Sequence, residues 1–518
     1  MFPAALAAAV SQALSSASAD GSLPSAAGTP VAMERPRDPA HGDWSTNVAL
    51  AAAKTAGKPP REVARAILDH LPEVPHLLAV EIAGPGFINF RLGAGWLEEI
   101  VRAAVGDGYG RSGESAGRVQ VEFVSVNPNG PIHIGHGRGG VLGDALCNIL
   151  DAAGYTTERE YYFNDAGVQM DLYAASVEAR YLQALGREAA VPDDGYHGDY
   201  IRDWGSELAG QHPEWAQMAA EERRRLVYGW GLERAMGDIR ETLDVAGIRF
   251  DVWFSERTLH ERSAVDAALD VLTQRGHTYR DGGALWFRTT SFGDEKDRVV
   301  VKADGAYTYV APDIAYHYDK LKRGFDLVIN IWGADHHGYI RRLKAGIEAL
   351  GYDPERLEVI ITQLVNVTRG GKPVRMSTRA GDFVTFREVL DEVGVDAARY
   401  FLLAYSPDTT INFDLEVAKK RSMDNPVYYL QYAHARVKSL QRVAAEAGVV
   451  RCPFEAADLH LLGEAAEADL IRQIGRLPEE VVLAARRRAP HRVVAYAAEL
   501  AGAFHKFYTD CRVLTDDA

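Results

Sequence analysis

The sequence predicts an α/β protein built around a parallel sheet, with a small α/β domain before it and an all-helical domain after it. Two stretches predict the sheet. Apolar residues alternate with polar ones over residues 119–123 and then recur at helical spacing over residues 136–150, so a strand passes through a glycine-rich turn into a helix. A second stretch, residues 327–332, is apolar at every position except Asn330, which is typical of a parallel strand covered on both faces.

The turn after the first strand has the composition of an anion-binding loop. Gly135 and the glycines that follow it allow backbone N–H groups at the helix start to approach a ligand closely. His133 and His136 add imidazoles that donate to a phosphate without the permanent charge of a lysine. The turn therefore predicts a nucleotide site. The alternative is an ordinary strand–helix turn with incidental histidines.

Residues 133–136 read HIGH, which is the first signature of the class I aminoacyl-tRNA synthetases, and the frame around them (EFVSVNPNGP before, GHGRG within) resembles the arginyl-tRNA synthetase version. The resemblance implies a class I, Rossmann-like nucleotide-binding domain that uses ATP to attach L-arginine to the 3′ end of tRNA(Arg). It also implies ATP with Mg²⁺, no protein-bound structural metal, tRNA(Arg), L-arginine and ATP as partners, and a monomer.

Composition limits the other classes. The chain has 518 residues, enough for about three domains, and contains no apolar run as long as a membrane span. Its net charge of −15 argues against a protein coated in nucleic acid, so RNA binding would rely on local patches. The three cysteines form no CxxC pair, which argues against a zinc site. Because no Lys or Arg precedes Arg35, we expect an amphipathic helix rather than a signal peptide at the start, and a cytoplasmic protein.

Residues 1–115 are expected to form the N-terminal domain. Helical patterns at the start and at residues 60–71, with a strand within residues 84–92, predict a small α/β module. Residues 41–54 and this strand resemble the N-terminal domain of arginyl-tRNA synthetases, which implies that Phe87 and Asn89 contact tRNA. That both residues simply complete a sheet edge is an equal alternative.

Residues 116–412 are expected to form the catalytic domain, with a charged helical insertion that ends near residue 250 and a β-rich segment at residues 284–309. Tyr309 and Asp313 resemble the pair that holds the substrate guanidinium in the family. A carboxylate suits this role because its two oxygens match the guanidinium fork, although capping of the following helix is the alternative for Asp313. The arginine pocket that the resemblance implies is completed by Glu122, Ser125, Asn127 and His136.

The strand at residues 327–332 ends at the sequence GADHHG. Ligands in open α/β sheets bind beyond the carboxyl ends of the strands, so the residues after this strand point into the crevice of the first signature. The resemblance makes Asp335 and His337 candidates for contacts to ATP, together with Gly135.

A further strand, residues 357–367, leads to a loop in the place of the second class I signature, KMSKS. The loop reads RMSTR, so Met376 and Ser377 match and are expected to contact ATP. Thr378 stands where the signature has its catalytic lysine.

The missing positive charge needs another source. Some arginyl synthetases carry a lysine just before HIGH, but Gly130 occupies that position here. We expect Arg379, with Lys372 as runner-up, to supply the charge, because a guanidinium contacts two phosphate oxygens at once.

Residues 413–518 are expected to form a helical anticodon-binding domain, and Tyr428, Tyr432 and Arg436 recur at four-residue spacing within it. Tyr432 and Arg436 are the expected tRNA contacts, with helix packing as the alternative. The family usually continues with further helix past the residues that end this chain, so we expect a truncated domain.

Two other functions compete. A tRNA-binding paralogue that has lost the activating lysine would bind without catalysis, but it would have no need of an intact HIGH sequence or of the pair Tyr309 and Asp313. A synthetase for another amino acid would require a pocket with less negative charge.

Overall fold

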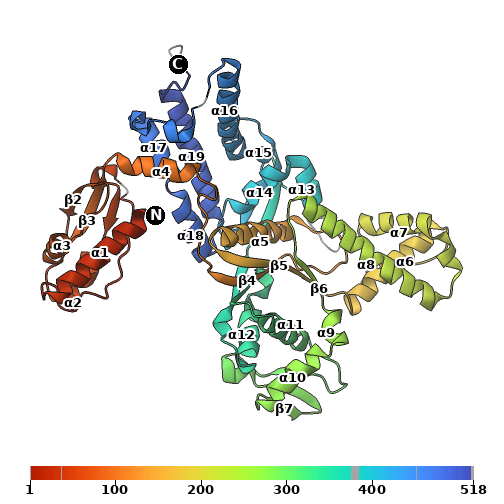
Figure 1. The fold of residues 1–518 in the computed structure, drawn as a ribbon. Coiled ribbons are helices and arrows are strands. Elements are labelled where there is room, and N and C mark those ends of the chain that lie inside the picture. The colour runs from red at the N-terminus through yellow and green to blue at the C-terminus, as the bar shows by residue number, and fades with distance from the viewer. Residues whose placement is uncertain (1, 37, 375–383, 451, 515–518) are drawn as a thin grey trace. The chain divides into compact units, whose positions relative to one another are not determined.

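The computed structural model describes residues 2–36, 38–374, 384–450 and 452–514 (Figure 1). The chain forms two compact units. One contains residues 1–109, 437–478 and 502–518, and the other contains residues 110–436 and 479–501. Both chain ends therefore belong to the same unit, and the boundaries predicted at residues 115 and 412 remain a prediction.

The first unit is built on a small antiparallel sheet with strand order β1-β3-β2. Trp44, Ile88 and Phe90 from this sheet are buried among apolar residues of the helices. Helix α4 packs on α17, and Ile471 of α17 is buried in the same core. The elements of this unit are α1 (Phe2–Ala19), β1 (Trp44–Thr46), α2 (Val48–Ala56), α3 (Pro60–Asp69), β2 (Leu77–Ala83), β3 (Phe87–Leu92), α4 (Gly95–Val105) and α17 (Ala465–Ile474).

The second unit is organised by a five-stranded sheet with the order β11-β10-β4-β5-β6, in which every pairing is parallel. The strands are β4 (Gly117–Glu122), β5 (Tyr155–Phe163), β6 (Val252–Ser255), β10 (Leu327–Gly333) and β11 (Leu357–Thr362). The chain runs outward from β4 to β6 and then returns to the other side of β4 with β10. This is the doubly wound arrangement, so the predicted fold class is confirmed.

The second unit also contains eleven α-helices among its described residues that lie wholly within it. They are α5 (Ile134–Ala152), α6 (Val168–Ala184), α7 (Asp199–Gln211), α8 (Ala220–Val245), α9 (Arg257–Glu261), α10 (Ala264–Gln274), α11 (Val310–Lys322), α12 (Ile340–Ala349), α13 (Phe386–Val393), α14 (Val395–Leu403) and α15 (Leu415–Lys419). Three further helices, α16 (Pro426–Glu446), α18 (Leu477–Arg487) and α19 (His491–Asp510), have residues in both units.

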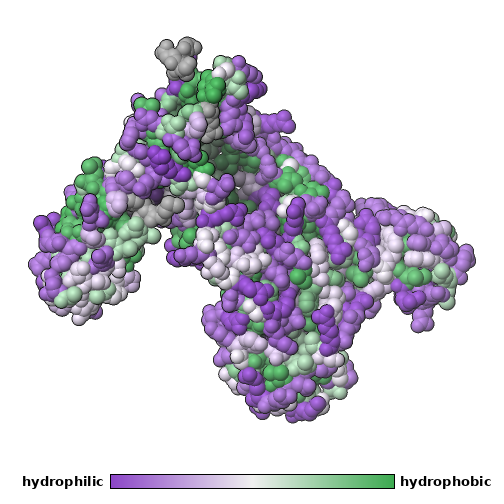
Figure 2. Space-filling model, in the orientation of Figure 1, coloured by the Kyte–Doolittle hydropathy of each residue, from purple (hydrophilic) through white to green (hydrophobic). Residues whose placement is uncertain are grey.

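Two insertions leave the sheet. Helices α6, α7 and α8 form a separate lobe around their own apolar cluster, and the visible face of this lobe carries mostly hydrophilic residues (Figures 1 and 2). Strands β7 (Thr278–Asp281), β8 (Ala284–Phe287) and β9 (Arg298–Val301) form a small antiparallel sheet. The helical insertion ends near residue 250 as predicted, whereas the small sheet spans residues 278–301 and thus begins before the predicted β-rich segment at residues 284–309.

Two glycines in α5, Gly137 and Gly143, serve close packing against aromatic rings. A Cβ atom at Gly143 would lie 2.2 Å from the ring of Phe123, and one at Gly137 would lie 2.4 Å from the ring of Phe386. The expectation that the whole glycine series opens the helix start to a ligand is therefore wrong at Gly137, which faces an aromatic ring instead.

The prediction of one strand over residues 357–367 is also wrong. The segment divides into β11 and β12 (Val365–Arg369), and β12 pairs with β13 (Lys372–Pro373) and β14 (Ile411–Asp414) in another sheet. Gln363 lies at the break. Its N–H donates to the carbonyl oxygen of Pro407 at 2.9 Å, and its carbonyl oxygen accepts from the buried Arg138 at 2.7 Å. These bonds replace the ladder bonds that a continuous strand would make.

Within the described ranges, no helix combines the length and the apolar composition that crossing a membrane requires.

Candidate active site

A cavity of about 300 Å³ opens at the carboxyl ends of β4 and β10. These are the two strands between which the direction of chain progression reverses, so the cavity lies at the position where doubly wound sheets bind ligands. Its lining residues are Glu122, Val124, Ser125, Val126, His136, Tyr162, Asp313, Tyr316, His317, Ile331, Trp332, Gly333, Tyr339 and Leu343.

The loop after β4 is held in an uncommon backbone conformation. Val124 and Ser125 both have positive φ, at 67° and 44°. Few non-glycine residues adopt this region, and a β-branched valine is particularly disfavoured there. The buried hydroxyl of Tyr161 holds the next residue, since it donates to the carbonyl oxygen of Val126 at 2.9 Å and accepts from its N–H at 3.3 Å. The loop is thus fixed against the neighbouring strand β5.

His133 and His136 lie stacked at the start of α5, with ring centroids 3.6 Å apart. His133 is the N-cap of the helix: its Nδ1 accepts from the N–H groups of Gly135 at 3.1 Å and of His136 at 3.4 Å. An accepting Nδ1 requires the proton to be on Nε2, so the donor of this neutral imidazole is Nε2–H.

Both histidines are neutral near pH 7. Burial lowers the pKa of His133, and burial, with repulsion from His133 whenever that ring is protonated, places the pKa of His136 well below its ordinary value. The Nδ1 atom of His136 is buried and has no hydrogen-bond partner within the described part of the chain. A buried nitrogen without a partner at the edge of a cavity fits a bound ligand that completes its hydrogen bonding.

Asp313 is the second carboxylate that lines the cavity, and it is partly buried, whereas Glu122 is only 5% exposed. Asp313 lies in the first turn of α11, and its Oδ2 accepts a short hydrogen bond from the hydroxyl of Tyr339. Burial is the largest reason why its pKa is raised to about 7. The charges of Glu256 and Glu122 act in the same direction, whereas the Tyr339 hydroxyl and the charge of Arg342 oppose them.

Glu122 lines the cavity but is already paired. Its Oε2 contacts the ammonium group of Lys320, a side chain with no exposed surface that also donates to Asn330 Oδ1 at 3.1 Å. The charge of Glu122 is therefore balanced by the protein, and Asp313 has no such buried lysine partner in the described structure.

The other residues predicted for the arginine pocket are placed differently. Ser125 lines the cavity, and its Oγ accepts from the N–H of Tyr162 at 3.1 Å. Asn127 is not a lining residue; its side chain accepts from the N–H of Asn164 at 3.3 Å and donates to Gln169 at 2.9 Å. Tyr309 is the N-cap residue of α11 and is 86% exposed, so the structure does not bring it together with Asp313 in the cavity.

Three residues near Asp313 are not among the site residues predicted from the sequence. Tyr339 donates to Asp313, Tyr162 lines the cavity, and Glu256 accepts a hydrogen bond from the Tyr162 hydroxyl. Tyr162 occupies the carboxyl end of β5, so strand position is a signal that could have identified it. Tyr339 and Glu256 follow the ends of β10 and β6, where the same rule applies.

Most of the predicted ATP contacts in the second signature lie outside the described residues, namely Met376, Ser377 and Arg379. Lys372 is described, and it is an exposed residue of β13. Asp335 and His337 belong to the short helix η4 (Ala334–Tyr339), and their side chains fall outside what the structure describes. Gly135 lies at the start of α5, where its N–H is bound by the His133 ring.

The predicted tRNA contacts in the first unit have contrasting environments. Phe87 is 39% exposed at the start of β3, whereas Asn89 is buried and its Oδ1 accepts from the Ser45 hydroxyl at 2.7 Å. Asn89 thus takes part in the sheet, which agrees with the alternative that this residue completes a sheet edge.

Tyr428, Tyr432 and Arg436 form a ladder on one side of α16. The rings of Tyr428 and Tyr432 lie nearly parallel with centroids 6.0 Å apart, and the Arg436 guanidinium lies 4.5 Å from the centre of the Tyr432 ring. All three side chains are partly exposed. This combination of aromatic and cationic surfaces is typical of a platform for RNA bases.

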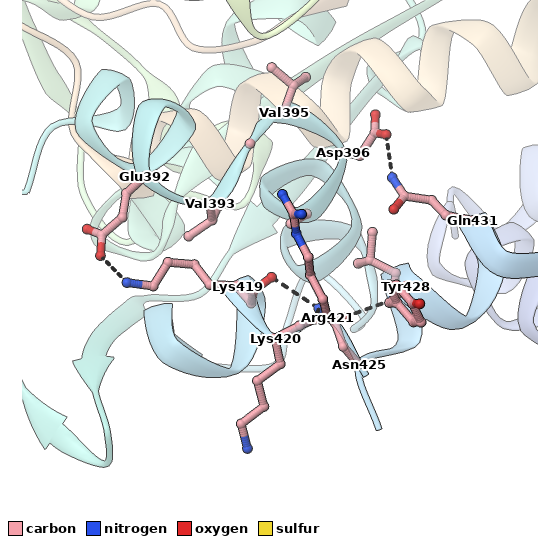
Figure 3. A pocket seen from close by; sticks show the side chains of 14 residues that line it. Glu392, Val393, Val395, Asp396, Lys419, Lys420, Arg421, Asn425, Tyr428 and Gln431 are labelled. Atoms are coloured by element: carbon pink, nitrogen blue, oxygen red, sulfur yellow. Dashed lines mark hydrogen bonds and ion pairs between the residues drawn. The ribbon is translucent and has the colours of Figure 1, made fainter. Parts of the chain in front are cut away.

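A second pocket of about 650 Å³ adjoins this ladder and includes Tyr428 (Figure 3). Two of its cations differ in their partners. Lys419 contacts Glu392 at 2.9 Å, whereas the exposed Lys420 and Arg421 have no ion pair within the described ranges. In Figure 3, Lys420 points away from the pocket and Arg421 points across it. Two exposed cations, Lys420 and Arg421, thus lie at this pocket beside the aromatic ladder.

Known proteins resemble the chain along its whole length. Residues 103–413 match the family of class I (R) tRNA synthetase catalytic domains, residues 4–92 match the arginyl-tRNA synthetase N-terminal domain, and residues 430–518 match the DALR anticodon-binding domain. The arginine–tRNA ligase of Moorella thermoacetica is 48% identical over 99% of this chain and 92% of its own. The arginine–tRNA ligase of Geobacillus kaustophilus is 51% identical over 94% of this chain and 88% of its own.

A solved structure agrees in fold. The Thermus thermophilus arginyl-tRNA synthetase is 23% identical, covers 99% of this chain and 92% of its own, and superposes with a TM-score of 0.76. With the doubly wound sheet, the HIGH sequence at the start of α5 and these matches, the chain belongs to the arginyl-tRNA synthetase family of class I aminoacyl-tRNA synthetases.

Proposed function

We propose that this protein is an arginine–tRNA ligase that activates L-arginine with ATP in the cavity between β4 and β10 and then transfers it to the 3′ end of tRNA(Arg). The observation that carries the proposal is the placement of a partly buried carboxylate, Asp313, in the same cavity as His136 of the HIGH sequence. One end of the cavity suits a guanidinium and the other suits a nucleotide.

The acidic end recognises the arginine side chain. Asp313 presents its carboxylate to the guanidinium, while Glu256 and Tyr162 lie beside it and add acceptors. Glu122 contributes less charge than the sequence analysis expects, because Lys320 already balances it. Ser125 lies where the loop after β4 meets the cavity, close to the amino-acid head.

The chemistry at the other end consists of positioning and electrostatic stabilisation. A carboxylate oxygen of arginine attacks the α-phosphorus of ATP, the bond to pyrophosphate breaks, and arginyl-adenylate forms. A hydroxyl of the terminal ribose then attacks the arginyl carbonyl, and AMP leaves. His133 and His136 donate neutral N–H groups to phosphate oxygens as charge develops on them.

Magnesium accompanies ATP in this proposal. Within the described residues, no group of three or more His, Cys, Asp and Glu side chains could hold a metal ion. In this proposal the ion is carried by the triphosphate of ATP, because Mg²⁺ commonly binds substrate phosphates and retains several waters. When bound, Mg²⁺ neutralises part of the phosphate charge.

The tRNA meets two surfaces in this proposal. Phe87 stacks against tRNA from the N-terminal sheet, and Tyr432 with Arg436 contacts bases from α16. Lys420 and Arg421 at the second pocket contact phosphates near that ladder. The enzyme acts as a monomer in the cytoplasm, where its tRNA substrate is used in translation.

ATP–pyrophosphate exchange tests the activity. We expect exchange with L-arginine in the presence of tRNA(Arg), and none with lysine or with the other amino acids. Exchange with another amino acid would identify a synthetase of different specificity. Tight tRNA binding without any exchange would identify the non-catalytic paralogue instead.

A further inference from the structure

Tyr339 holds a position that the reaction itself does not explain. It is the last residue of η4 and the N-cap residue of α12, and its hydroxyl donates to Asp313 Oδ2 inside the cavity. Asp313 Oδ2 is one of the two acceptors that a substrate guanidinium needs. The protein therefore supplies its own donor to the atom that the substrate must reach.

The Tyr339 ring is held on two sides. The Arg342 guanidinium lies 4.7 Å from the centre of the ring, and Trp332 meets it edge-on with centroids 6.2 Å apart. Arg342 is oriented by Asp294, whose Oδ2 lies 3.9 Å from its Nε. Asp294 is in turn fixed by Arg298 through two hydrogen bonds of 2.8 and 2.9 Å. A ring fixed in this way directs its hydroxyl at one point.

The hydroxyl does not have to leave when arginine binds. A carboxylate carries about four lone-pair sites on its two oxygens, so Oδ2 can accept from Tyr339 and from a guanidinium N–H together. Without substrate, a buried carboxylate that lacked any donor would bear the full cost of desolvation. Because Oδ2 can accept from both donors, Asp313 is hydrogen-bonded both with and without bound arginine, and Tyr339 does not have to move far.

We propose that Tyr339 is a positioning residue for arginine recognition, whose hydroxyl orients the Asp313 carboxylate so that the guanidinium meets a preformed acceptor. The inference rests on the proposed arginine site and adds a residue to it. It assigns to Tyr339 an effect on arginine affinity rather than on the later chemical steps.

The pH dependence of arginine binding reports this role. Several charged or titratable groups surround Asp313 in the cavity or act on it: Glu122 from β4, Tyr162 from β5, Glu256 before α9, His136 from α5, His317 from α11, and Tyr339 and Arg342 at the start of α12. Among these groups, the Tyr339 hydroxyl is the largest influence that lowers the pKa of Asp313. Removal of the hydroxyl should raise this pKa, so that a higher pH is needed to ionise the carboxylate.

The experiment is calorimetric titration of the full chain with L-arginine between pH 6 and pH 9. In the wild type, affinity should rise with pH through about 7, where Asp313 loses its proton. Tyr339→Phe should bind arginine about three- to tenfold more weakly at pH 7, which is the usual net value of one intramolecular hydrogen bond. Its affinity should approach that of the wild type at the alkaline end, and kcat at saturating arginine should be retained.

Tyr307→Phe is the matched control, since it removes a Tyr hydroxyl that donates to Asp266 at 2.5 Å outside the cavity. It should leave arginine affinity unchanged at every pH. If Tyr339→Phe binds like the wild type throughout, or more weakly by a constant factor with the same pH midpoint, Tyr339 does not position Asp313.

Two further variants distinguish failure of the proposed arginine site from failure of the proposed role of Tyr339. Asp313→Asn should bind weakly with little pH dependence; wild-type binding by that variant would overturn the arginine site itself. If Tyr339→Phe does not fold, Arg342→Gln replaces it, because Arg342 supports the ring and its charge also favours the ionised carboxylate. Arg342→Gln should shift the pH midpoint upward, and an unshifted midpoint would contradict the proposal.

Discussion

Asp313 combines burial with charge, and such a carboxylate is stable only when it has donors around it. A guanidinium supplies paired N–H groups that match the two carboxylate oxygens, whereas a lysine ammonium is a point charge. The selectivity of the enzyme for arginine over lysine should therefore depend on this residue.

Asp313→Asn should lower kcat/KM for arginine by the equivalent of about 2–4 kcal/mol, by analogy with breaking a buried ion pair. Steady-state aminoacylation with varied arginine measures the effect. The KM for ATP should be almost unaffected, which distinguishes loss of the guanidinium contact from general damage. Unchanged kinetics for arginine would remove Asp313 from the pocket.

Thr378 stands where the second signature normally has a lysine, and Arg379 and Lys372 are the nearby candidates to replace its charge. Removal of a preorganised donor typically lowers the rate by about 10²–10³. We expect Arg379→Ala to lower kcat by about this factor with little change in arginine binding, and Thr378→Lys to retain or increase the rate. Wild-type single-turnover rates in both Arg379→Ala and Lys372→Ala would show that the charge comes from elsewhere.

Sequence alone could predict Asp313 and His136, because both lie in stretches whose letters resemble a family signature and both line the cavity. Tyr339, Tyr162 and Glu256 could not be predicted in the same way. They follow or end three different strands, β10, β5 and β6, and meet only because the sheet order makes β5 and β6 neighbours and separates β10 from β5 by β4 alone. The pairing of Glu122 with Lys320 was missed for the same reason: the two residues are 198 positions apart.

At the scale of elements, one residue at the start of helix α5, His133, has two roles. His133 caps the helix with Nδ1 and is proposed to donate to ATP with Nε2. Loss of an N-cap typically costs about 0.5–2 kcal/mol of stability, and asparagine is a good replacement cap.

The two roles can be separated by two substitutions. His133→Ala should lower both the thermal midpoint and kcat, whereas His133→Asn should restore most of the stability while kcat stays well below that of the wild type. Thermal unfolding and aminoacylation rates on the same samples check this. Full recovery of kcat in His133→Asn would mean that the imidazole acts only as a cap.

The two cations at the pocket beside α16 are expected to contribute to the affinity for tRNA. Lys420→Ala combined with Arg421→Ala should weaken tRNA binding and reduce the slope of log Kd against log salt by about one to two, since each phosphate contact contributes about one. The KM for arginine should not change. Arg262→Ala, which removes an exposed cation at the end of α9, is the control and should leave the salt dependence as it is. Equal slopes in all three proteins would exclude these two residues from the tRNA interface.

At the scale of the molecule, the cavity and the tRNA surfaces belong to one catalytic cycle. The family resemblance implies that activation waits for tRNA, and a physical reason is available: binding energy from the tRNA orders loops at the crevice before chemistry begins. We expect arginine-dependent pyrophosphate exchange to require tRNA(Arg). Strong exchange without tRNA would contradict this, and tRNA lacking its terminal adenosine should still support exchange if ordering rather than transfer is what matters.

The larger architecture was easier to predict than its details. The helical spacing of α5 and the apolar run of β10 indicate a doubly wound sheet, because these periodicities reflect burial on one or both faces. The alternation in β4 is less informative, because its polar residues Gln120 and Glu122 are buried as well. The break at Gln363 could not be read from the sequence. It depends on the distant Arg138 and Pro407, which satisfy the backbone of that residue.

The first unit joins the two ends of the chain, and this has a consequence for biosynthesis. Ile471 of α17 completes a core whose other buried residues precede residue 98. A ribosome adding about 5–20 residues per second needs roughly 20–75 s to traverse the intervening chain. During that interval the nascent N-terminal module exposes the apolar side of α4 that α17 later covers. That side is where a nascent-chain chaperone would find its binding site, and where a premature stop codon would leave the module permanently uncovered.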